Sequence, residues 1–334
     1  MSSDITRPVT ILTGFLGAGK TTFLNDLLQR NPNKKYAIIE NEYGKESIDS
    51  ELILRAEDGI IELNNGCLCC TLNENLYDIL NTLHQRREEY DEVIIEATGV
   101  ADPRGLADPF LNNYSIKKQF PLNRIICLVD AEQVEDQLRL TEEAIHQITY
   151  SDVLIVNKID LVSTDRISKL KELLNGLNPL AEIIQGSKDG FPSIEQTAHN
   201  TDLDEGIFNA AKAESITSWP VTKPHEHHLH DHTDGVVSHM IEFDQPFDYT
   251  MLHVRVLGFL AFQAEGLYRM KGLIWVSHSD QQMLLQSVGP RLSIDDKRPW
   301  QQDEVRSSKI VVIGKGFQKK SLEKMFSQCI KKAN

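Results

Sequence analysis

The sequence predicts an α/β protein with a doubly wound, mostly parallel sheet, followed by a second, smaller α/β domain. Two observations lead to this fold class. Short β-branched runs alternate with amphipathic helical stretches through the first two-thirds of the 334 residues, and further strand-like runs follow a polar segment near residue 200. The alternation predicts βαβ units, which form a parallel sheet with helices on both faces.

The strands of the first domain are predicted from apolar runs at residues 9–12, 36–39, 93–95, 125–129, 153–156 and 183–184. Between these runs, apolar residues recur three or four positions apart, as at Leu76, Ile79 and Leu83. This is the period of an amphipathic helix, so strands and helices alternate along the chain.

A polar segment separates the two domains. Periodicity fades around residues 196–235, which are rich in Thr, Asn, Asp, Pro and His. We therefore predict a first domain at 1–205, a His-rich linker at 206–235 and a C-terminal domain at 236–334. Strand-like runs at 239–243, 273–276, 283–288 and 310–313 and an amphipathic stretch at 319–332 form the last of these.

Composition and charge narrow the class of protein. A net charge of −14 without a basic stripe argues against a nucleic-acid partner. No run approaches the ~18 apolar residues of a membrane span, and residues 1–8 carry no apolar leader, so we expect a cytoplasmic protein without a membrane partner. Three of the five cysteines lie within four positions, which favours a metal or redox role over disulfides. We expect Cys127 and Cys329 to be buried thiols.

A glycine-rich motif predicts a phosphate site. The segment from Gly14 to Thr21 matches G-x-x-x-x-G-K-[ST] and lies between a strand-like run and a helical stretch, which is typical of a P-loop NTPase. Backbone N–H groups of such a loop face the phosphates, Lys20 lies between the β- and γ-phosphates, and Thr21 ligates Mg²⁺. The predicted phosphate-binding residues are Gly14, Gly17, Ala18, Gly19, Lys20, Thr21 and Thr22.

A second motif predicts that the base is guanine. Asn157, Lys158 and Asp160 form N-K-x-D after the apolar run 153–156, at a strand end where doubly wound sheets bind ligands. The Asp160 carboxylate can accept from the N1 and N2 donors of guanine. Adenine lacks this donor pair and would leave the carboxylate unpaired, at a cost of about 1–3 kcal/mol. We therefore expect GTP as the nucleotide.

The segment from Glu96 to Gly99 resembles the D-x-x-G element of GTPases, with Glu in place of Asp. Glu96 would hold Mg²⁺ together with Thr21, and the Gly99 N–H would contact the γ-phosphate. Lys20, Thr21, Glu96 and Gly99 are therefore the predicted catalytic residues. No Gln follows Gly99 directly and no Arg finger is evident, so we expect slow intrinsic GTP hydrolysis.

A cysteine cluster predicts a transition-metal site. Cys67, Cys69 and Cys70 follow a turn-forming Asn-Asn-Gly segment, and residues i and i+2 of an extended backbone point to the same side. Thiolates favour Zn²⁺, with Co²⁺ and Ni²⁺ as further candidates, and three ligands leave one position open. A structural zinc site and inert or redox-active thiols are the alternatives.

Further residues could complete the metal site. Glu40 and Glu42 follow the second strand-like run and could ligate either Mg²⁺ or the thiolate-bound ion, and a solvated acidic turn is the alternative. Five histidines between residues 225 and 232 could capture metal, or could belong to a plain flexible linker.

The motifs at residues 14–22, 40–44, 66–70, 96–103 and 157–160, in this order, resemble the CobW-type metallochaperones, which belong to the CobW/HypB/UreG class of P-loop GTPases. Residues 268–275, 298–300 and 310–314 are similar to the C-terminal domain of that family. The resemblance is to the branch linked to zinc homeostasis. One departure is Lys45, where similar sequences often carry an acid.

The resemblance implies a chaperone that binds GTP and a transition metal and loads the metal into a client metalloprotein during a GTP cycle. Two alternatives remain, namely a regulatory GTPase with a structural zinc and a metal-storage protein without turnover. The sequence leaves the client, the physiological metal and the oligomeric state open, a homodimer included.

Overall fold

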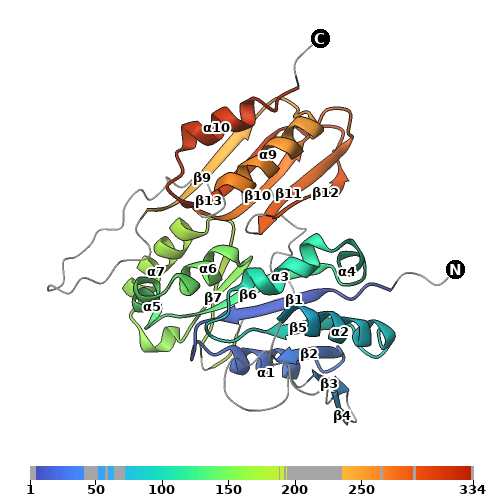
Figure 1. Ribbon diagram of the computed structural model, residues 1–334. Coiled ribbons are helices and arrows are strands. Elements are labelled where there is room, and N and C mark those ends of the chain that lie inside the picture. Colours follow the sequence, from blue (N-terminus) through green and yellow to red (C-terminus); the bar gives the residue numbers. More distant parts are fainter. Residues whose placement is uncertain are drawn as a thin grey trace. The chain divides into compact units, whose positions relative to one another are not determined.

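The structure is a computed structural model of the chain and describes residues 5–40, 52–56, 59–63, 72–187, 189–191, 193, 235–263, 266–288 and 291–331 (Figure 1). It contains two compact units. One comprises residues 1–134, 151–163 and 184–200, and the other comprises residues 135–150, 164–183 and 201–334. Each unit has its own sheet, so we describe them in turn.

The first sheet has eight strands in the order β4-β3-β2-β5-β1-β6-β7-β8. Strands β2, β5, β1, β6 and β7 pair in parallel, and β3 and β4 add an antiparallel edge. The predicted doubly wound, mostly parallel sheet is confirmed. The bounds are β1 (Val9–Gly14), β2 (Tyr36–Glu40), β3 (Leu52–Ala56), β4 (Gly59–Leu63), β5 (Glu92–Glu96), β6 (Leu122–Asp130), β7 (Val153–Asn157) and β8 (Glu182–Gln185).

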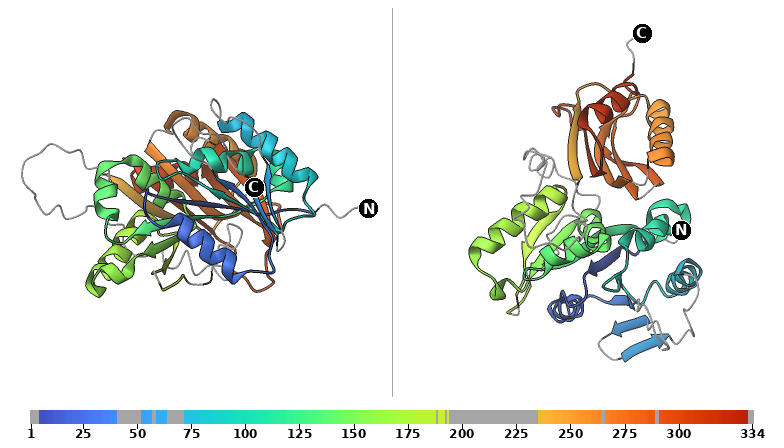
Figure 2. Two further views of the ribbon diagram at one scale, coloured as in Figure 1. Left: turned by 90° about the horizontal axis from the view of Figure 1, so that it is seen from below. Right: turned by 60° about the vertical axis from the view of Figure 1, so that its left-hand side comes forward.

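The central strands are nearly continuous apolar runs because both of their faces are covered. Every residue of β1 and β7 is buried, as parallel strands under two helical layers require. Helix α1 (Lys20–Arg30) packs Phe23, Leu24 and Leu27 on one face of the sheet. Figure 2 shows α2 (Leu72–Gln85) on the opposite face. Helix α1 connects β1 to β2 in one direction across the sheet, and α2 connects β4 to β5 in the other direction. Right-handed connections therefore place the two helices on opposite faces.

Further helices connect the strands. They are α3 (Pro103–Asn112), α4 (Tyr114–Gln119), α5 (Val134–Leu140), α6 (Glu142–Tyr150), the 3₁₀ turn η1 (Ile159–Leu161) and α7 (Thr164–Leu177). Helix α3 begins with Pro103 at its first position, and the Asp102 side chain accepts from the Arg104 N–H as an N-cap. Among the described helices, none combines the length and the apolar character that crossing a bilayer requires.

The second sheet is antiparallel, with the strand order β12-β11-β10-β13-β9. Helices α9 (Tyr249–Gln263) and α10 (Lys319–Ser327) pack on one face of it around a shared apolar core. The predicted second α/β domain is confirmed. The strands are β9 (Val236–Phe243), β10 (Leu267–Trp275), β11 (Gln281–Val288), β12 (Arg291–Pro299) and β13 (Ser308–Lys315).

The predicted closing helix at 319–332 is too long, because α10 ends at Ser327. After that residue the backbone bonds to another segment instead of continuing the helix. The Asp248 N–H donates to the Cys329 carbonyl at 2.8 Å, and the Lys331 N–H donates to the Pro246 carbonyl at 2.8 Å.

Helices α6 and α7 belong to the compact unit of the C-terminal sheet. The His146 ring lies edge-on to Tyr268, with centroids 5.0 Å apart, and Lys315 pairs with Glu142 at 3.1 Å. The predicted domain boundary at residue 205 was placed where the sequence pattern changes, whereas the two compact units interleave along the chain. The boundary therefore stays a prediction. The proposed linker at 206–235 lies outside the described residues, apart from Gly235.

Candidate nucleotide-binding site

The phosphate loop connects β1 to α1, and its glycines are required by geometry. Gly14 has φ +135°, and an added Cβ would lie 2.4 Å from the Leu128 carbonyl oxygen of β6. Gly19 has φ +102°, and its Cβ would lie 2.4 Å from Nδ2 of Asn157. Gly17 also has a positive φ, +77°. Side chains at these positions would strain the backbone, and they would also displace the β6 backbone at Gly14 and the Asn157 side chain at Gly19.

Lys20 lies folded over this loop. Its side chain is 9% exposed, and Nζ donates to the Gly14 carbonyl at 2.8 Å and to the Phe15 carbonyl at 3.3 Å. Burial lowers the pKa of Lys20, while the charge of Glu96 and the Cys127 thiol act in the opposite direction. Anionic phosphate oxygens would replace neutral carbonyls as acceptors and would favour the charged ammonium.

Thr21 and Glu96 are brought together from distant parts of the sequence. The Thr21 Oγ1 donates to Oε1 of Glu96 at 2.9 Å. The other carboxylate oxygen of Glu96 is buried and makes no hydrogen bond. A hydroxyl beside a buried, unsatisfied carboxylate oxygen fits the oxygen ligands that Mg²⁺ prefers. The donor set is thus suited to the predicted cation.

The segment after Glu96 touches the phosphate loop. An added Cβ at Gly99 would lie 2.6 Å from the backbone nitrogen of Leu16. The Ala97 N–H donates to the Leu12 carbonyl at 2.8 Å, which fixes the segment against β1. This arrangement places the predicted γ-phosphate contact, Gly99, directly beside the loop that would hold the phosphates.

The base-recognition motif is tied to the same loop. Asn157 ends β7, and its side-chain amide donates to the Ala18 carbonyl at 2.8 Å. Lys158 has a left-handed backbone, with φ 60°, and its Nζ lies 2.7 Å from Oδ2 of Asp130. Asp160 lies in the exposed turn η1. The phosphate loop follows β1, Glu96 ends β5 and the N-K-x-D motif follows β7, so the three predicted motifs lie at the carboxyl ends of parallel strands of one sheet.

Sequence reasoning missed three groups at this site. Asp130 is 1% exposed, ends β6 and fixes Lys158. Its signal was an acid directly after the apolar run 125–129, the same strand-end rule that located Glu96. The hydroxyls of Thr13 and Thr98 are buried without a hydrogen bond, which makes them further polar groups available near the loop.

The predicted transition-metal site is only partly covered by the structure. Glu40 ends β2, and its Cα is in register with that of Glu96 on β5. Glu42, Cys67, Cys69 and Cys70 lie outside the described residues, as do the five linker histidines. Within the described part of the chain, no three His, Cys, Asp or Glu side chains converge as a metal site would require.

The two remaining cysteines are buried, as predicted. Cys127 is 2% and Cys329 1% exposed, and both are free thiols. Burial raises the pKa of the Cys127 thiol to about 12 and also raises the pKa of Cys329. Such thiols stay protonated near neutral pH and are poor metal ligands.

A strand, a glycine loop around a buried lysine, a helix, and an asparagine that joins the loop to a second strand end define a P-loop nucleotide-binding protein. The family model for the CobW/HypB/UreG nucleotide-binding domain matches residues 8–185, and the model for the cobalamin synthesis protein CobW C-terminal domain matches residues 236–330. The chain belongs to the CobW/HypB/UreG family.

Several relatives resemble the chain over most of its length. It is 33% identical to the zinc chaperone YjiA of Escherichia coli, over 92% of this chain and 93% of the relative. It is 30% identical to the zinc chaperone CobW of Pseudomonas aeruginosa, over 92% and 87%. The crystal structure of Zn(II)-bound YjiA GTPase superposes with a TM-score of 0.65 at 32% identity and covers 98% of this chain and 99% of that one.

Proposed function

We propose that this chain is a GTP-hydrolysing metallochaperone that binds Zn²⁺, or a similar ion such as Co²⁺ or Ni²⁺, through Cys67, Cys69 and Cys70 and transfers it to a client protein. The observation that carries the proposal is the bond between the Asn157 amide and the Ala18 carbonyl. It makes the base-recognition motif and the phosphate loop one site. The names of the two relatives, both zinc chaperones, support the metal function.

The loop and the two strand ends divide the work of binding GTP. The backbone and side chains of Gly14, Gly17, Ala18, Gly19, Lys20, Thr21 and Thr22 would surround the phosphates. Asp160 would accept from the guanine edge, and Asn157 and Lys158 would hold the recognition turn against Ala18 and Asp130. The lysine thus has a structural role here, through its ion pair with a buried carboxylate.

Hydrolysis would depend on charge neutralisation by few groups. Mg²⁺ bound by Thr21 and Glu96 would supply a positive charge beside the β- and γ-phosphate oxygens. Lys20 would contribute a second cation and the Gly99 N–H a hydrogen bond to the γ-phosphate. Because no glutamine follows Gly99 to orient water, we expect turnover to be slow until a partner or a bound metal accelerates it.

Chain geometry supports a metal site close to the phosphates. Strand β4 runs parallel to β1, because β4 is antiparallel to β3, β3 is antiparallel to β2, and β2 runs in the same direction as β1. Leu63, the last residue of β4, aligns through the paired residues of the strands between them with Ile11 of β1. Four strand spacings of ~4.8 Å separate β4 from β1, about 19 Å in all. The eight residues 64–71 can span at most about 26 Å. Cys69 and Cys70, six and seven residues after Leu63, can lie up to about 20–23 Å from it, so the chain is long enough for these two thiols to reach the end of β1.

Strand β2, which pairs with β5, ends in a second glutamate at the same end of the sheet. Glu40 and Glu96 are register partners on β2 and β5, so the two candidate cation sites share a sheet end. Residues 41–50 follow directly after Glu40, in the position where GTPases carry a nucleotide-sensitive segment. If Glu40 or Glu42 is a ligand of the transition metal, the segment that follows β2 would connect the transition-metal site to the Mg²⁺ site.

Paired variants test the proposal. Replacement of Cys67, Cys69 and Cys70 by Ser should weaken Zn²⁺ binding at least tenfold, measured by chelator competition, and should leave GTP affinity unchanged. Lys20→Ala should abolish GTP turnover and retain Zn²⁺ binding. Cys329→Ala is the matched control, because its thiol is buried in the C-terminal core. Unchanged zinc affinity in the triple variant would contradict the assignment of the thiols.

Chelation separates the proposal from its two alternatives. A chaperone should remain folded after zinc is removed and should rebind it, whereas a structural zinc contributes folding energy and its removal would unfold the domain. A storage protein would bind GTP without cleaving it. Circular dichroism before and after chelation, together with phosphate release from GTP, distinguishes the three.

A further inference from the structure

Helix α9 of the C-terminal unit is apolar on both sides. On its inner side Leu252, Val256 and Leu260 are fully buried in the core. A surface helix normally turns polar side chains to solvent on its outer side. The sequence of α9 contains one arginine and no acid, so its outer side departs from this rule.

The outer side of α9 carries a continuous apolar stripe. Met251, Val254 and Phe262 are 45%, 64% and 90% exposed, and Gly258 lies between them at helical spacing. We call these four residues the α9 stripe. It spans twelve residues, or about 16 Å of helix. A patch of large apolar side chains in one row is typical of a binding surface rather than of scattered surface residues.

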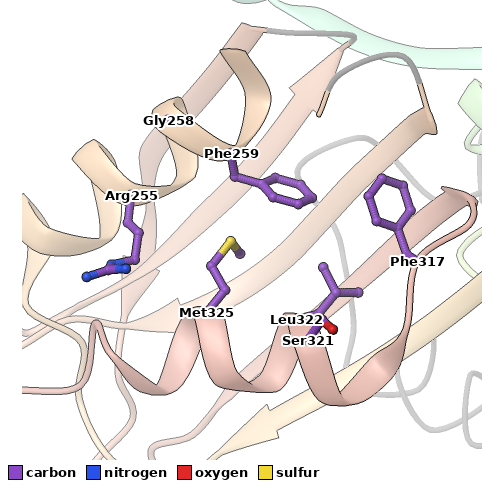
Figure 3. A pocket seen from close by; sticks show the side chains of 7 residues that line it. All are labelled: Arg255, Gly258, Phe259, Phe317, Ser321, Leu322 and Met325. Atoms are coloured by element: carbon purple, nitrogen blue, oxygen red, sulfur yellow. The ribbon is translucent and has the colours of Figure 1, made fainter. Parts of the chain in front are cut away.

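A cavity of about 380 Å³ opens beside the α9 stripe. Figure 3 shows the side chains of Phe259 from α9, Met325 and Leu322 from α10, and Phe317 from the segment before α10 turned toward this space. The Phe259 and Phe317 rings lie 5.6 Å apart between centroids. The volume is in the range that accepts one or two large side chains of a ligand.

The walls of the cavity are fixed in place. The Phe317 carbonyl bonds to Nε2 of His239 at 2.9 Å, which holds the aromatic ring against the end of the sheet. Leu322 is 2% exposed, and Phe259, Phe317 and Met325 pack against the buried core. A preformed site of this kind requires little ordering on binding.

One basic residue, Arg255, lines the cavity, and α10 beside it carries further basic residues outside the lining; we call Arg255 and Lys324 the rim. Arg255 lies at one end of the cavity, as Figure 3 shows. The second helix, α10, contributes Lys319, Lys320 and Lys324 against the single acid Glu323. The chain carries a formal net charge of −14, so four cations against one carboxylate on these two helices is a local reversal of sign.

We propose that the α9 stripe and the adjoining cavity bind an acidic amphipathic helix of a partner protein. Its apolar side chains lie along the stripe and fill the cavity, and its carboxylates face Arg255 and Lys324. The stripe extends over about three turns of α9, which favours a helix over a small molecule as the ligand. Two copies of this chain would bring like-charged rims together, which disfavours a homodimer through this face.

A designed peptide tests the proposal on the full-length chain, without GTP or metal. The probe is a fluorescein-labelled 16-residue helical peptide with Leu or Phe at four positions of one stripe and Glu on both flanks. One control peptide has the same composition with the apolar residues spread around the helix, and the other has Lys in place of Glu. Fluorescence anisotropy should give at least tenfold tighter binding of the probe than of either control.

Matched variants locate the binding surface. Val254→Glu should weaken binding of the probe at least tenfold through charge in the stripe, and Arg255→Glu with Lys324→Glu should do so through the rim. Lys169→Glu on α7 is the control, because it makes the same charge reversal at an exposed lysine on another helix, and it should bind the probe like the wild type. Val254, Arg255 and Lys324 are exposed, so melting temperatures should stay unchanged.

Four results would overturn the proposal. They are equal binding of probe and control peptides, unchanged binding by the stripe and rim variants, a wild-type dimer in sedimentation velocity that Val254→Glu dissociates, and binding to phosphatidylserine vesicles that Val254→Glu abolishes. The third would assign the surface to a second copy of the chain and the fourth to a membrane.

Discussion

Asn157 joins two halves of the nucleotide site that lie 139 positions apart in the sequence. Its amide donates to the Ala18 carbonyl of the phosphate loop, and its side chain occupies the space that a Cβ at Gly19 would need. The residue is 5% exposed, so the carbonyl it satisfies has little access to water. A single side chain thereby joins the phosphate loop to the end of β7.

Asn157→Ala should weaken GTP binding. The buried Ala18 carbonyl would lose its donor, and an unsatisfied buried acceptor costs about 1–3 kcal/mol, or roughly a 5- to 150-fold loss of affinity if the cost is expressed on binding. Calorimetry with GTP measures the effect. Asn112→Ala, at an amide that bonds only within α3, is the control. Equal affinity in the two variants would contradict this role of Asn157.

Ionisation of the Cys127 thiol should make the free energy of unfolding fall at alkaline pH. Its pKa is raised to about 12 in the folded chain and is near 9 when exposed, so unfolding favours ionisation above pH 9. A raised pKa gives stability that is full below pH 9 and is lost as the pH rises toward 12. Between pH 8 and pH 10 the wild type should lose about 1.4 kcal/mol more free energy of unfolding than Cys127→Val. Urea unfolding at both values measures this, and parallel losses would contradict it.

At the scale of elements, the segment 96–99 and the phosphate loop are in direct contact. Gly99 approaches Leu16 so closely that an added Cβ would lie 2.6 Å from its nitrogen. Backbone atoms cannot yield as a flexible side chain can, so any residue larger than glycine must move one segment away from the other. Contact of this kind is what a nucleotide-sensitive element requires.

Gly99→Ala should therefore lower GTP turnover at least tenfold, because a displaced segment would misplace both Glu96 and the N–H that we predict to contact the γ-phosphate. Gly105→Ala is a suitable control, since an added Cβ there meets no atom within 4 Å in helix α3. That variant should keep its activity and gain about 0.4–1 kcal/mol in stability. Phosphate release measures the activity, and equal rates would speak against the contact.

The sequence predicted those strands and helices in which the apolar residues follow one clear period. Strands β1, β6 and β7 are continuous apolar runs, and the phosphate loop lies between strand and helix as its motif requires. Strands β3 and β4 were not predicted because short apolar runs do not distinguish strand from helix. Strand β12 was missed because four consecutive charged residues, 295–298, interrupt the apolar pattern of a strand. The contacts of Asn157 with Ala18 and of Asp130 with Lys158 show a further limit, since partners distant in sequence leave no local pattern.

At the scale of the whole molecule, the helices around the base-recognition motif associate with the C-terminal sheet. Helix α6 precedes β7 and α7 follows η1, and both belong to the unit that contains β9 and β10. Arg269 of β10 bonds to the Thr149 carbonyl at 3.5 Å, and Tyr268 packs on His146. The C-terminal sheet thus contributes to the stability of the helices that flank the N-K-x-D motif.

A chain shortened to residues 1–200 should be less stable than the intact protein. The packed side of α6, including His146, would lose its contact with Tyr268 and become exposed. Loss of even 2 kcal/mol lowers the melting temperature by roughly 4–8 °C in a domain of this size. Differential scanning fluorimetry measures the shift. An unchanged melting temperature would mean that α6 and the rest of the shortened chain do not depend on the C-terminal sheet for stability.

The proposed function requires that the nucleotide and the transition metal affect each other's binding. The most direct measurement is the Zn²⁺ affinity of the purified apoprotein with Mg²⁺ and either GDP or a non-hydrolysable GTP analogue. A coupling of about 1–3 kcal/mol predicts a 5- to 150-fold difference in affinity between the two nucleotide states, and the same factor for nucleotide binding with and without zinc. Equal zinc affinities in both states would contradict the account.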